Sequence, residues 1–283
     1  MFEKVSIVMP AYNEARHIVG NMRETIATMN ELGVPFEIIL VDDGSQDRTC
    51  EEAVCHLNGM GRNVKVARYR ENAGKGNALM CGFNFATGDI IAFLDADMDL
   101  HPRQLPALFE VMQSRSADVV IGSKRHPRSD VNYPFVRKIW SSGYAFLVGL
   151  LFGLPLRDTQ TGLKVFRAEV LRSVFPRILA KRFAFDVEVL VVAHHFGYKI
   201  CDAPVTLRFK RGSFGRVNLT DVWNVFIDTL AIFYRMRLLR YYDRPLVQMP
   251  AFPLHEVDVF LGVSEQAGDP VASLSAGQSA PRI

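Results

Sequence analysis

The residues from Ile90 to Leu94 form an uninterrupted apolar run that leads directly into three aspartates at alternate positions, Asp95, Asp97 and Asp99. A run of this length is typical of a strand that is buried on both faces, as in a parallel sheet. Ligands of such sheets bind outside the carboxyl ends of the strands. We therefore expect the three carboxylates to lie in a binding site.

Carboxylates crowded on one loop repel one another, and a divalent cation such as Mg²⁺ or Mn²⁺ is the usual partner that stabilises the arrangement. A cation that takes only some of its ligands from the protein keeps coordination positions open for phosphate oxygens. The alternative is an exposed turn that caps the next helix, because Asp is common both in turns and at helix N-caps. The rest of the chain favours the cation site.

Apolar runs of strand type alternate with segments of helical spacing along the first 122 residues. Strands are expected at residues 4–9, 36–41, 64–69, 90–94 and 118–122, and helices at 14–33, from about 47, at 78–86 and at 103–113. This alternation predicts a parallel, doubly wound α/β sheet. A second group of carboxylates, Asp42 and Asp43, follows the second strand and is expected at the same edge of the sheet.

Two common nucleotide-binding patterns are missing from the sequence. The segment Gly74-Lys75-Gly76 lacks the Ser or Thr that ends a Walker A loop, and no GxGxxG pattern follows the first strand. These absences argue against a kinase-like or a dehydrogenase function. The formal net charge of +3 is too small to indicate a nucleic-acid-binding protein.

The cellular location is predicted from three features. The four cysteines show no metal-ligand spacing, so we expect free thiols in a reducing compartment. The chain enters its first strand without the basic and apolar regions of a signal peptide. The longest uncharged apolar segment, 143–156, is shorter than the about 20 residues that span a bilayer. We therefore expect a cytoplasmic protein.

Two segments of the carboxyl-terminal half combine aromatic, apolar and basic residues. Arg137 and Lys138 precede the apolar segment 139–156, and a helix expected over 221–242 carries Arg235, Arg237 and Arg240 late in its length. Such helices are typical of a membrane surface with anionic headgroups, which would make the protein peripheral on the membrane. A core helix with a solvated basic end, whose cations oppose the helix dipole, is the alternative.

Six motifs occur in this order: Pro10-Ala11-Tyr12-Asn13-Glu14, Val41-Asp42-Asp43-Gly44-Ser45, Asp95-Ala96-Asp97, Gly122-Ser123-Lys124, residues 158–164, and Arg211-Gly212-Ser213. Together they resemble the motifs of the inverting family 2 glycosyltransferases with the GT-A fold, and within them the dolichyl- or polyprenyl-phosphate hexosyltransferases. The resemblance covers about residues 4–243. It implies a Rossmann-like, doubly wound and mostly parallel sheet followed by amphipathic interfacial helices.

The resemblance also implies roles for individual residues. Those that would hold the base and ribose of a sugar nucleotide are Pro10, Tyr12, Glu14, Val41 and Asp43. Those that would lie at the metal and the diphosphate are Asp95, Ala96, Asp97 and Asp99, the last in place of a glutamine. Those that would serve catalysis or bind the acceptor phosphate, together with Asp97, are Lys124, Arg125, Arg137, Ser141 and Arg211. Lys124 replaces an arginine and loses its bidentate fork, for which Arg125 would compensate.

The implied function is metal-dependent, inverting transfer of mannose or glucose from a GDP- or UDP-sugar to a polyprenyl phosphate at the cytoplasmic membrane face. Residues 158–164 look closer to dolichyl-phosphate glucose synthases, so UDP-glucose competes with GDP-mannose as the donor. An acceptor phosphate is already anionic and needs no general base, whereas a sugar hydroxyl would need one, such as Asp186 or Glu188. That alternative acceptor stays open.

The expected domains are a GT-A catalytic domain over 1–218, an amphipathic membrane-surface helix over 219–244, and a disordered tail over 245–283, where the sequence loses its periodicity. A hypothesis of a different class is a non-catalytic scaffold that binds nucleotide sugars and recruits a membrane partner. A membrane-embedded partner subunit would also be compatible with the enzyme.

Overall fold

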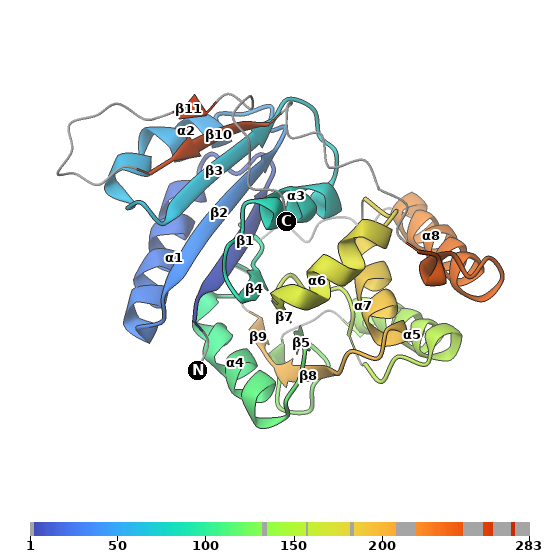
Figure 1. Cartoon of the computed structure of the whole chain (residues 1–283). Helices are drawn as coiled ribbons and strands as arrows, with labels where there is room; N and C mark the ends of the chain where they lie inside the picture. The colour runs from blue at the N-terminus through green and yellow to red at the C-terminus, as the bar shows by residue number, and fades with distance from the viewer. Residues whose placement is uncertain are drawn as a thin grey trace. The chain divides into compact units, whose positions relative to one another are not determined.

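A computed structural model of the chain describes residues 3–131, 135–156, 158–181, 184–207, 219–245, 257–262 and 273–274, with only the backbone described at 135–142, 219–222 and 273–274. The chain divides into two compact units. One contains residues 1–98 and 250–283, and the other contains residues 99–249. Figure 1 labels their helices and strands.

The first unit is built on four parallel strands in the order β3-β2-β1-β4 (Figure 1). They are β1 (Val5–Ala11), β2 (Phe36–Asp43), β3 (Val64–Tyr69) and β4 (Ile90–Phe93). The connecting helices are α1 (Ile18–Leu32), α2 (Thr49–Cys55) and α3 (Lys75–Asn84), with a short 3₁₀ turn η1 at Leu57–Gly59. The predicted parallel α/β arrangement of this region is confirmed.

Glycine sets the spacing between α3 and the sheet. A Cβ atom at Gly82 would lie only 2.3 Å from Cγ1 of Val8, so the helix packs closer to β1 than any larger residue would allow. The β1 and β4 side chains beneath the helices are buried, as expected for strands covered on both faces.

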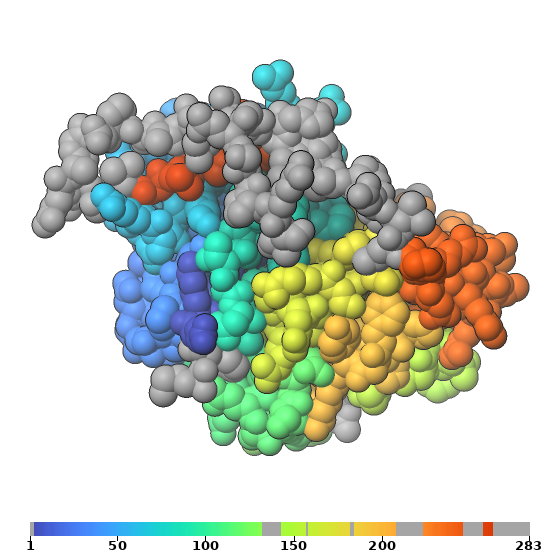
Figure 2. Space-filling view, in the orientation of Figure 1, coloured from blue at the N-terminus to red at the C-terminus, as the bar shows by residue number. Residues whose placement is uncertain are grey.

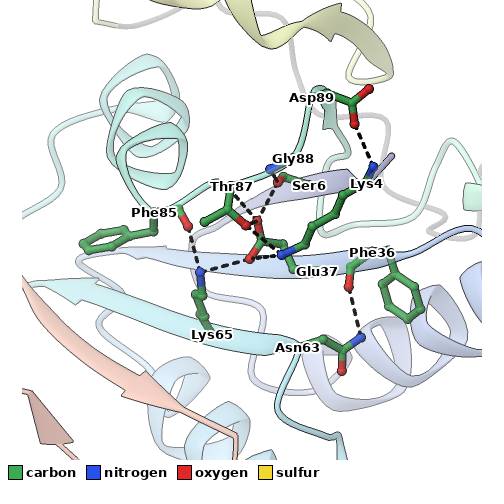
Figure 3. A network of polar contacts seen from close by, with 10 residues as sticks. All are labelled: Lys4, Ser6, Phe36, Glu37, Asn63, Lys65, Phe85, Thr87, Gly88 and Asp89. Atoms are coloured by element: carbon green, nitrogen blue, oxygen red, sulfur yellow. Dashed lines mark hydrogen bonds and ion pairs between the residues drawn. The ribbon is translucent and has the colours of Figure 1, made fainter. Parts of the chain in front are cut away.

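The amino-terminal ends of the strands are joined by a buried carboxylate, Glu37 of β2 (Figure 3). Its oxygens accept hydrogen bonds from Ser6 Oγ at 2.6 Å, from Thr87 N at 2.6 Å and from Lys65 Nζ at 2.9 Å. Burial alone would raise the pKa of Glu37, but these donors outweigh it and hold the pKa at about 2. The network therefore stabilises the sheet at the edge away from the predicted site.

The carboxyl-terminal segment extends the sheet of the first unit. Strand β10 (Asp258–Leu261) pairs antiparallel with β3, and β11 (Ser273–Leu274) pairs with β10. The predicted disordered tail over 245–283 is therefore wrong at these residues. Without β10, this edge of β3 would leave its backbone groups unpaired, and Val259 and Phe260 favour strand structure. Residues 246–256, 263–272 and 275–283 lie outside the described residues.

The second unit contains the strands β5 (Val119–Ser123), β7 (Lys164–Arg167) and β8 (Ile200–Pro204). Strand β8 is parallel to β5, and β7 is antiparallel to it. The two short strands β6 (Asp130–Val131) and β9 (Thr206–Leu207) pair separately. The helices are α4 (Leu105–Ser114), α5 (Phe135–Phe152), α6 (Ala168–Val174), α7 (Phe185–His195) and α8 (Leu219–Arg237), with 3₁₀ turns η2 (Pro102–Gln104), η3 (Phe175–Arg177) and η4 (Tyr241–Asp243).

The last helix is shorter than predicted. Helix α8 ends at Arg237, and Arg240 has a left-handed backbone with φ of 45°, which interrupts the helix before η4. The single membrane-surface helix predicted over 219–244 is therefore corrected to α8 followed by a separate turn. Within the part of the chain that the structure describes, none of the helices combines the length and the hydropathy needed to cross a bilayer.

Candidate active site

The loops after β1 and β2 are bound to each other. Asn13 N donates a hydrogen bond to Ser45 Oγ at 2.9 Å, and Gln46 N donates to Asn13 Oδ1 at 2.9 Å. Glu14 N donates to Thr49 Oγ1 at 2.7 Å, at the start of α2. The structure thus brings together the two motifs that were predicted to hold a nucleoside.

Within these loops the predicted residues differ in exposure. Tyr12 is 42% exposed, which leaves its ring available for stacking on a base. Pro10 and Glu14 are half-buried. The side chains of Val41 and, at the third motif, Ala96 are buried, so any contact with a nucleotide would come from their backbone atoms. Tyr12 is therefore the side chain best presented for recognition.

Asp43, the last residue of β2, orders the loop that leads into α3. Its Oδ1 accepts a hydrogen bond from Ala73 N at 2.8 Å, and its Oδ2 accepts bonds from Gly74 N and from Asn72 Nδ2, both at 3.1 Å. Burial raises the pKa of Asp43 above its usual value, although these hydrogen bonds oppose the shift. Neighbouring Gly44 has φ of 64°, and a Cβ there would lie 2.6 Å from Asn72 N, so the close approach requires glycine.

The carboxylates after β4 keep their predicted alternation. Asp95, Asp97 and Asp99 are half-buried, whereas the residues that follow each of them are buried: Ala96, Met98 and Leu100. Asn21 Nδ2 of α1 donates a hydrogen bond to Ala96 O at 2.7 Å, and Met98 has φ of 59°. The hydrogen bond from Asn21 anchors the turn that presents the carboxylates.

Lys75, the first residue of α3, joins the candidate site although no motif of the sequence pointed to it. Its Nζ atom lies 2.5 Å from Oδ1 of Asp95. The segment Gly74-Lys75-Gly76 opens the helix that follows β3, and it carries no sequence signal for a partner 20 residues later in the chain.

The donor set near Asp95 fits a hard cation shared with a substrate. Among the described residues, no three or more His, Cys, Asp or Glu side chains are grouped so as to hold a metal ion. Mg²⁺ is usually bound through one or two carboxylates together with substrate phosphates, and Mn²⁺ also accepts carboxylate and phosphate oxygens. Asp95 and Asp97 are two carboxylates of this kind, and the assignment of Asp95, Asp97 and Asp99 as metal ligands stays a prediction.

In the second unit, the end of β5 is bound to the loop that precedes β7. Lys124 N donates a hydrogen bond to Asp158 Oδ2 at 3.2 Å, and Gln160 N donates to Asp158 Oδ1 at 3.2 Å. Lys124 and Arg125 are half-buried. The side chains of Arg137 and Ser141 in α5, and the whole of Arg211, lie outside the described residues, so their roles stay predictions.

The two acids considered as general bases have partners of their own. Asp186 Oδ1 accepts a hydrogen bond at 2.7 Å from the ammonium of Lys164, which is buried. Glu188 is fully buried, and its two oxygens accept bonds from four donors: Leu179 N at 3.0 Å, Ala180 N at 2.6 Å, Arg235 Nη2 at 2.8 Å and Tyr242 OH at 2.5 Å. The oxygens of Glu188 are therefore occupied, whereas the ion pair of Asp186 engages its Oδ1 atom.

Comparison with known families decides the class of enzyme. The model described as "Glycosyl transferase family 2" matches residues 6–175. The chain belongs to glycosyltransferase family 2. The prediction of a glycosyltransferase from the six motifs is thereby confirmed at the level of the family.

Relatives of this glycosyltransferase include lipid-phosphate sugar transferases. It is 32% identical over 234 residues to the dolichyl-phosphate beta-glucosyltransferase of Drosophila melanogaster, covering 78% of this chain and 71% of the relative. It is 34% identical over 200 residues to the undecaprenyl-phosphate 4-deoxy-4-formamido-L-arabinose transferase of Sodalis glossinidius, and the match covers 68% of this chain and 60% of the relative. The match to the glycosyltransferase AglD of Haloferax volcanii, 32% identical over 204 residues, covers 71% of this chain but only 32% of that protein.

Solved structures support the fold of this family 2 enzyme. Mannosyl-3-phosphoglycerate synthase from Rubrobacter xylanophilus aligns with a TM-score of 0.60 at 19% identity, over 96% of this chain and 86% of that one. Glucosyl-3-phosphoglycerate synthase from Mycobacterium tuberculosis aligns with a TM-score of 0.57 at 22% identity, over 86% of this chain and 81% of that one. That protein was crystallised with Mn²⁺, UDP-glucose and phosphoglyceric acid. The predicted mixed α/β fold of GT-A type is confirmed.

Proposed function

We propose that this family 2 glycosyltransferase transfers a hexose from a nucleoside diphosphate sugar to a polyprenyl phosphate, with inversion at the anomeric carbon, at the cytoplasmic face of a membrane. The observation that carries the proposal is the pair Asp95 and Asp97, which a held turn presents at the end of the buried strand β4. The names of the relatives, a dolichyl-phosphate glucosyltransferase and an undecaprenyl-phosphate sugar transferase, support the acceptor class.

The residues of the first unit would bind and orient the donor. Tyr12 is exposed and would stack on the base, while Asp43 holds the loop beside it in place. Asp95 and Asp97 would hold Mg²⁺ or Mn²⁺, which would supply positive charge for the departing diphosphate. This division of labour matches the chemistry, because a leaving nucleoside diphosphate gains negative charge as the glycosidic bond breaks.

A phosphate acceptor fits the second unit better than a hydroxyl acceptor. A general base must lie within hydrogen-bond reach of the proton that it removes. Glu188 is fully buried with its oxygens occupied, and Asp186 is paired with Lys164. A phosphate monoester is already an anionic nucleophile, so it requires positioning and not deprotonation.

UDP-glucose is the favoured donor. Two of the relatives are named dolichyl-phosphate beta-glucosyltransferases, from Drosophila melanogaster and Dictyostelium discoideum. The segment from Asp158 to Lys164 looks similar to that of glucose synthases, and its Asp158 accepts a hydrogen bond from the backbone N–H of Lys124, which follows β5. GDP-mannose is the competing donor.

A donor and acceptor screen tests the function. Purified protein is incubated with Mn²⁺ and radiolabelled UDP-glucose or GDP-mannose, together with vesicles that contain a polyprenyl phosphate. We expect organic-extractable label from UDP-glucose. Vesicles containing the same polyprenol without its phosphate serve as the matched control and should give none. Equal labelling of the free polyprenol would contradict the phosphate acceptor, and no labelled lipid with any donor would contradict the function.

We propose that helices α5 and α8, which pack together, bind the membrane surface. Tyr144 OH and Thr229 Oγ1 are hydrogen-bonded at 2.9 Å, and the rings of Phe152 and Phe233 meet edge to face. Figure 2 shows α8, in orange, at the surface. Large apolar side chains are exposed at helical spacing along α8 and just beyond it: Trp223, Ile227, Leu230, Tyr234 and Leu238. On α5, Phe146 and Leu150 are exposed in the same way. This stripe would enter the headgroup region of a bilayer.

One of the three predicted surface cations has a different role. The guanidinium of Arg235 donates to Glu188 and to Tyr242, so it is corrected to an internal partner. Arg237 and Arg240 are exposed and remain the cations available to anionic lipids.

Replacing both Trp223 and Leu230 with Ala is expected to weaken binding to anionic vesicles by about tenfold or more, because two exposed apolar side chains no longer enter the bilayer. Co-sedimentation with vesicles measures the change. Leu179→Ala is the control, since Leu179 is also exposed but does not belong to the stripe. Unchanged partitioning of the double variant would contradict the proposed membrane surface.

A further inference from the structure

The ion pair between Lys75 and Asp95 lies in the part of the first unit where the donor would bind. The two charged atoms are 2.5 Å apart, and the side chains are 37% and 32% exposed. Both groups are therefore within reach of a ligand from solvent. The pair joins the start of α3 to the turn after β4, two elements that follow different strands of the sheet.

The backbone of Lys75 is anchored while its side chain can reorient. Gly74, the N-cap of α3, has φ of 95° and donates its N–H to Asp43, as Ala73 does. Beyond this fixed backbone, lysine carries a compact charge on a flexible stem of four carbons. Its ammonium can leave Asp95 without any movement of the helix.

The charges make this pair and a bound metal ion competitors. Asp95 is also the carboxylate proposed to hold a divalent cation, and an ammonium at 2.5 Å from its Oδ1 repels a second positive charge at the same group. A diphosphate changes the balance, because it brings negative charge with which a displaced ammonium can pair. The positive end of the α3 dipole favours the same anion.

We propose that Lys75 is the built-in counter-ion of Asp95, which neutralises this carboxylate in the empty donor site and leaves it when the cation and the nucleoside diphosphate bind together. The inference rests on the proposed function, since it takes Asp95 as a ligand of the cation. It follows that the cation alone binds weakly, because it must displace Lys75. Nucleotide and cation should then strengthen each other's binding by the same factor, as linkage requires.

The test measures Mn²⁺ binding to the full chain from the electron paramagnetic resonance signal of free Mn²⁺, with and without UDP. Lys75→Met keeps the length and the apolar stem of the side chain and removes its charge. We expect Lys75→Met to bind Mn²⁺ alone about 2- to 5-fold more tightly than the wild type, the range of an exposed ion pair. The gain in Mn²⁺ affinity on adding UDP should shrink by at least that factor.

Two control variants separate this effect from others. Lys75→Arg keeps the charge and should keep the wild-type pattern. Lys181→Met removes an exposed lysine of the second unit and should also leave Mn²⁺ binding unchanged, which excludes an effect of net charge alone. Circular dichroism checks that each variant is folded, and Lys75→Gln replaces Lys75→Met if the latter is not.

The outcomes distinguish the inference from the proposed function. If Lys75→Met binds Mn²⁺ alone no better than the wild type, or more weakly, the counter-ion proposal is overturned, while wild-type binding of Mn²⁺ with UDP still supports the transferase. If the wild type binds neither Mn²⁺ nor a nucleotide, both proposals fail. Tighter Mn²⁺ binding together with a smaller nucleotide gain supports the assignment of Lys75.

Discussion

Asp97→Asn is expected to lower the rate of hexose transfer by about 10²- to 10³-fold, the loss typical of removing one group that stabilises charge in a transition state. The amide has nearly the same shape as the carboxylate but lacks the negative charge that attracts a divalent cation. Asp97 is half-buried in the turn after β4, outside the apolar core, so the fold should be retained. Labelled lipid formed per minute, measured over a range of Mn²⁺ concentrations, checks the rate.

The matched control for this variant is Asp89→Asn, which makes the same chemical change just before β4, at the other end of the strand. Asp89 is exposed and accepts a hydrogen bond from Lys4 N at 2.7 Å, in the network of Figure 3. The Asp89→Asn variant should transfer hexose at the wild-type rate. Full activity of Asp97→Asn with unchanged dependence on Mn²⁺ would show that Asp97 is not a metal ligand.

The strands of the first unit were predictable because their signal is local. A strand buried on both faces requires a continuous apolar run, and the run at 90–94 contains β4, whose four residues are all buried. Strand β2 extends to Asp43, two residues past the predicted end, because Asp42 and Asp43 still pair with β3. The motifs that follow the strands could be assigned to one site because a parallel sheet brings the carboxyl ends of its strands together.

The contacts that define the candidate site were not predictable from local patterns. Asp43 is bound to backbone N–H groups 30 and 31 residues later in the chain, and a carboxylate carries no signal for such a partner. The pairing of β10 with β3 is similar, because a four-residue strand in a tail rich in Pro, Gly, Ser and Ala is too short to be recognised before its edge partner is known. Lys75 and Asp95 meet only when the ends of α3 and β4 are in place.

Glu188 illustrates how tertiary structure decides between two functions of one residue. From sequence alone, an acid on an apolar helix fitted either a structural role or a general base. The structure places Arg235 and Tyr242, which lie 47 and 54 residues later, against its Oε1 atom. Two backbone N–H groups, of Leu179 and Ala180, occupy Oε2. Glu188 therefore joins α7 to the end of α8, which bears the proposed membrane surface.

Glu188→Gln is accordingly expected to lower the free energy of unfolding by about 3–5 kcal/mol, the usual cost of breaking a buried ion pair by removing one partner. The change leaves Arg235 without its anionic partner, and the amide NH₂ group cannot accept hydrogen bonds from the donors that now meet a carboxylate oxygen. Urea unfolding should show a lower midpoint with an unchanged slope.

The control for Glu188→Gln is the same substitution at Glu169, an exposed acid in the first turn of α6, which should change the free energy of unfolding by no more than about 0.5 kcal/mol. The two roles of Glu188 predict opposite results. If Glu188 were a general base, Glu188→Gln would be as stable as the wild type and would lose transfer at all temperatures. A structural Glu188 instead gives a destabilised protein that still transfers hexose below its unfolding transition, because the reaction with an anionic acceptor needs no base from this helix.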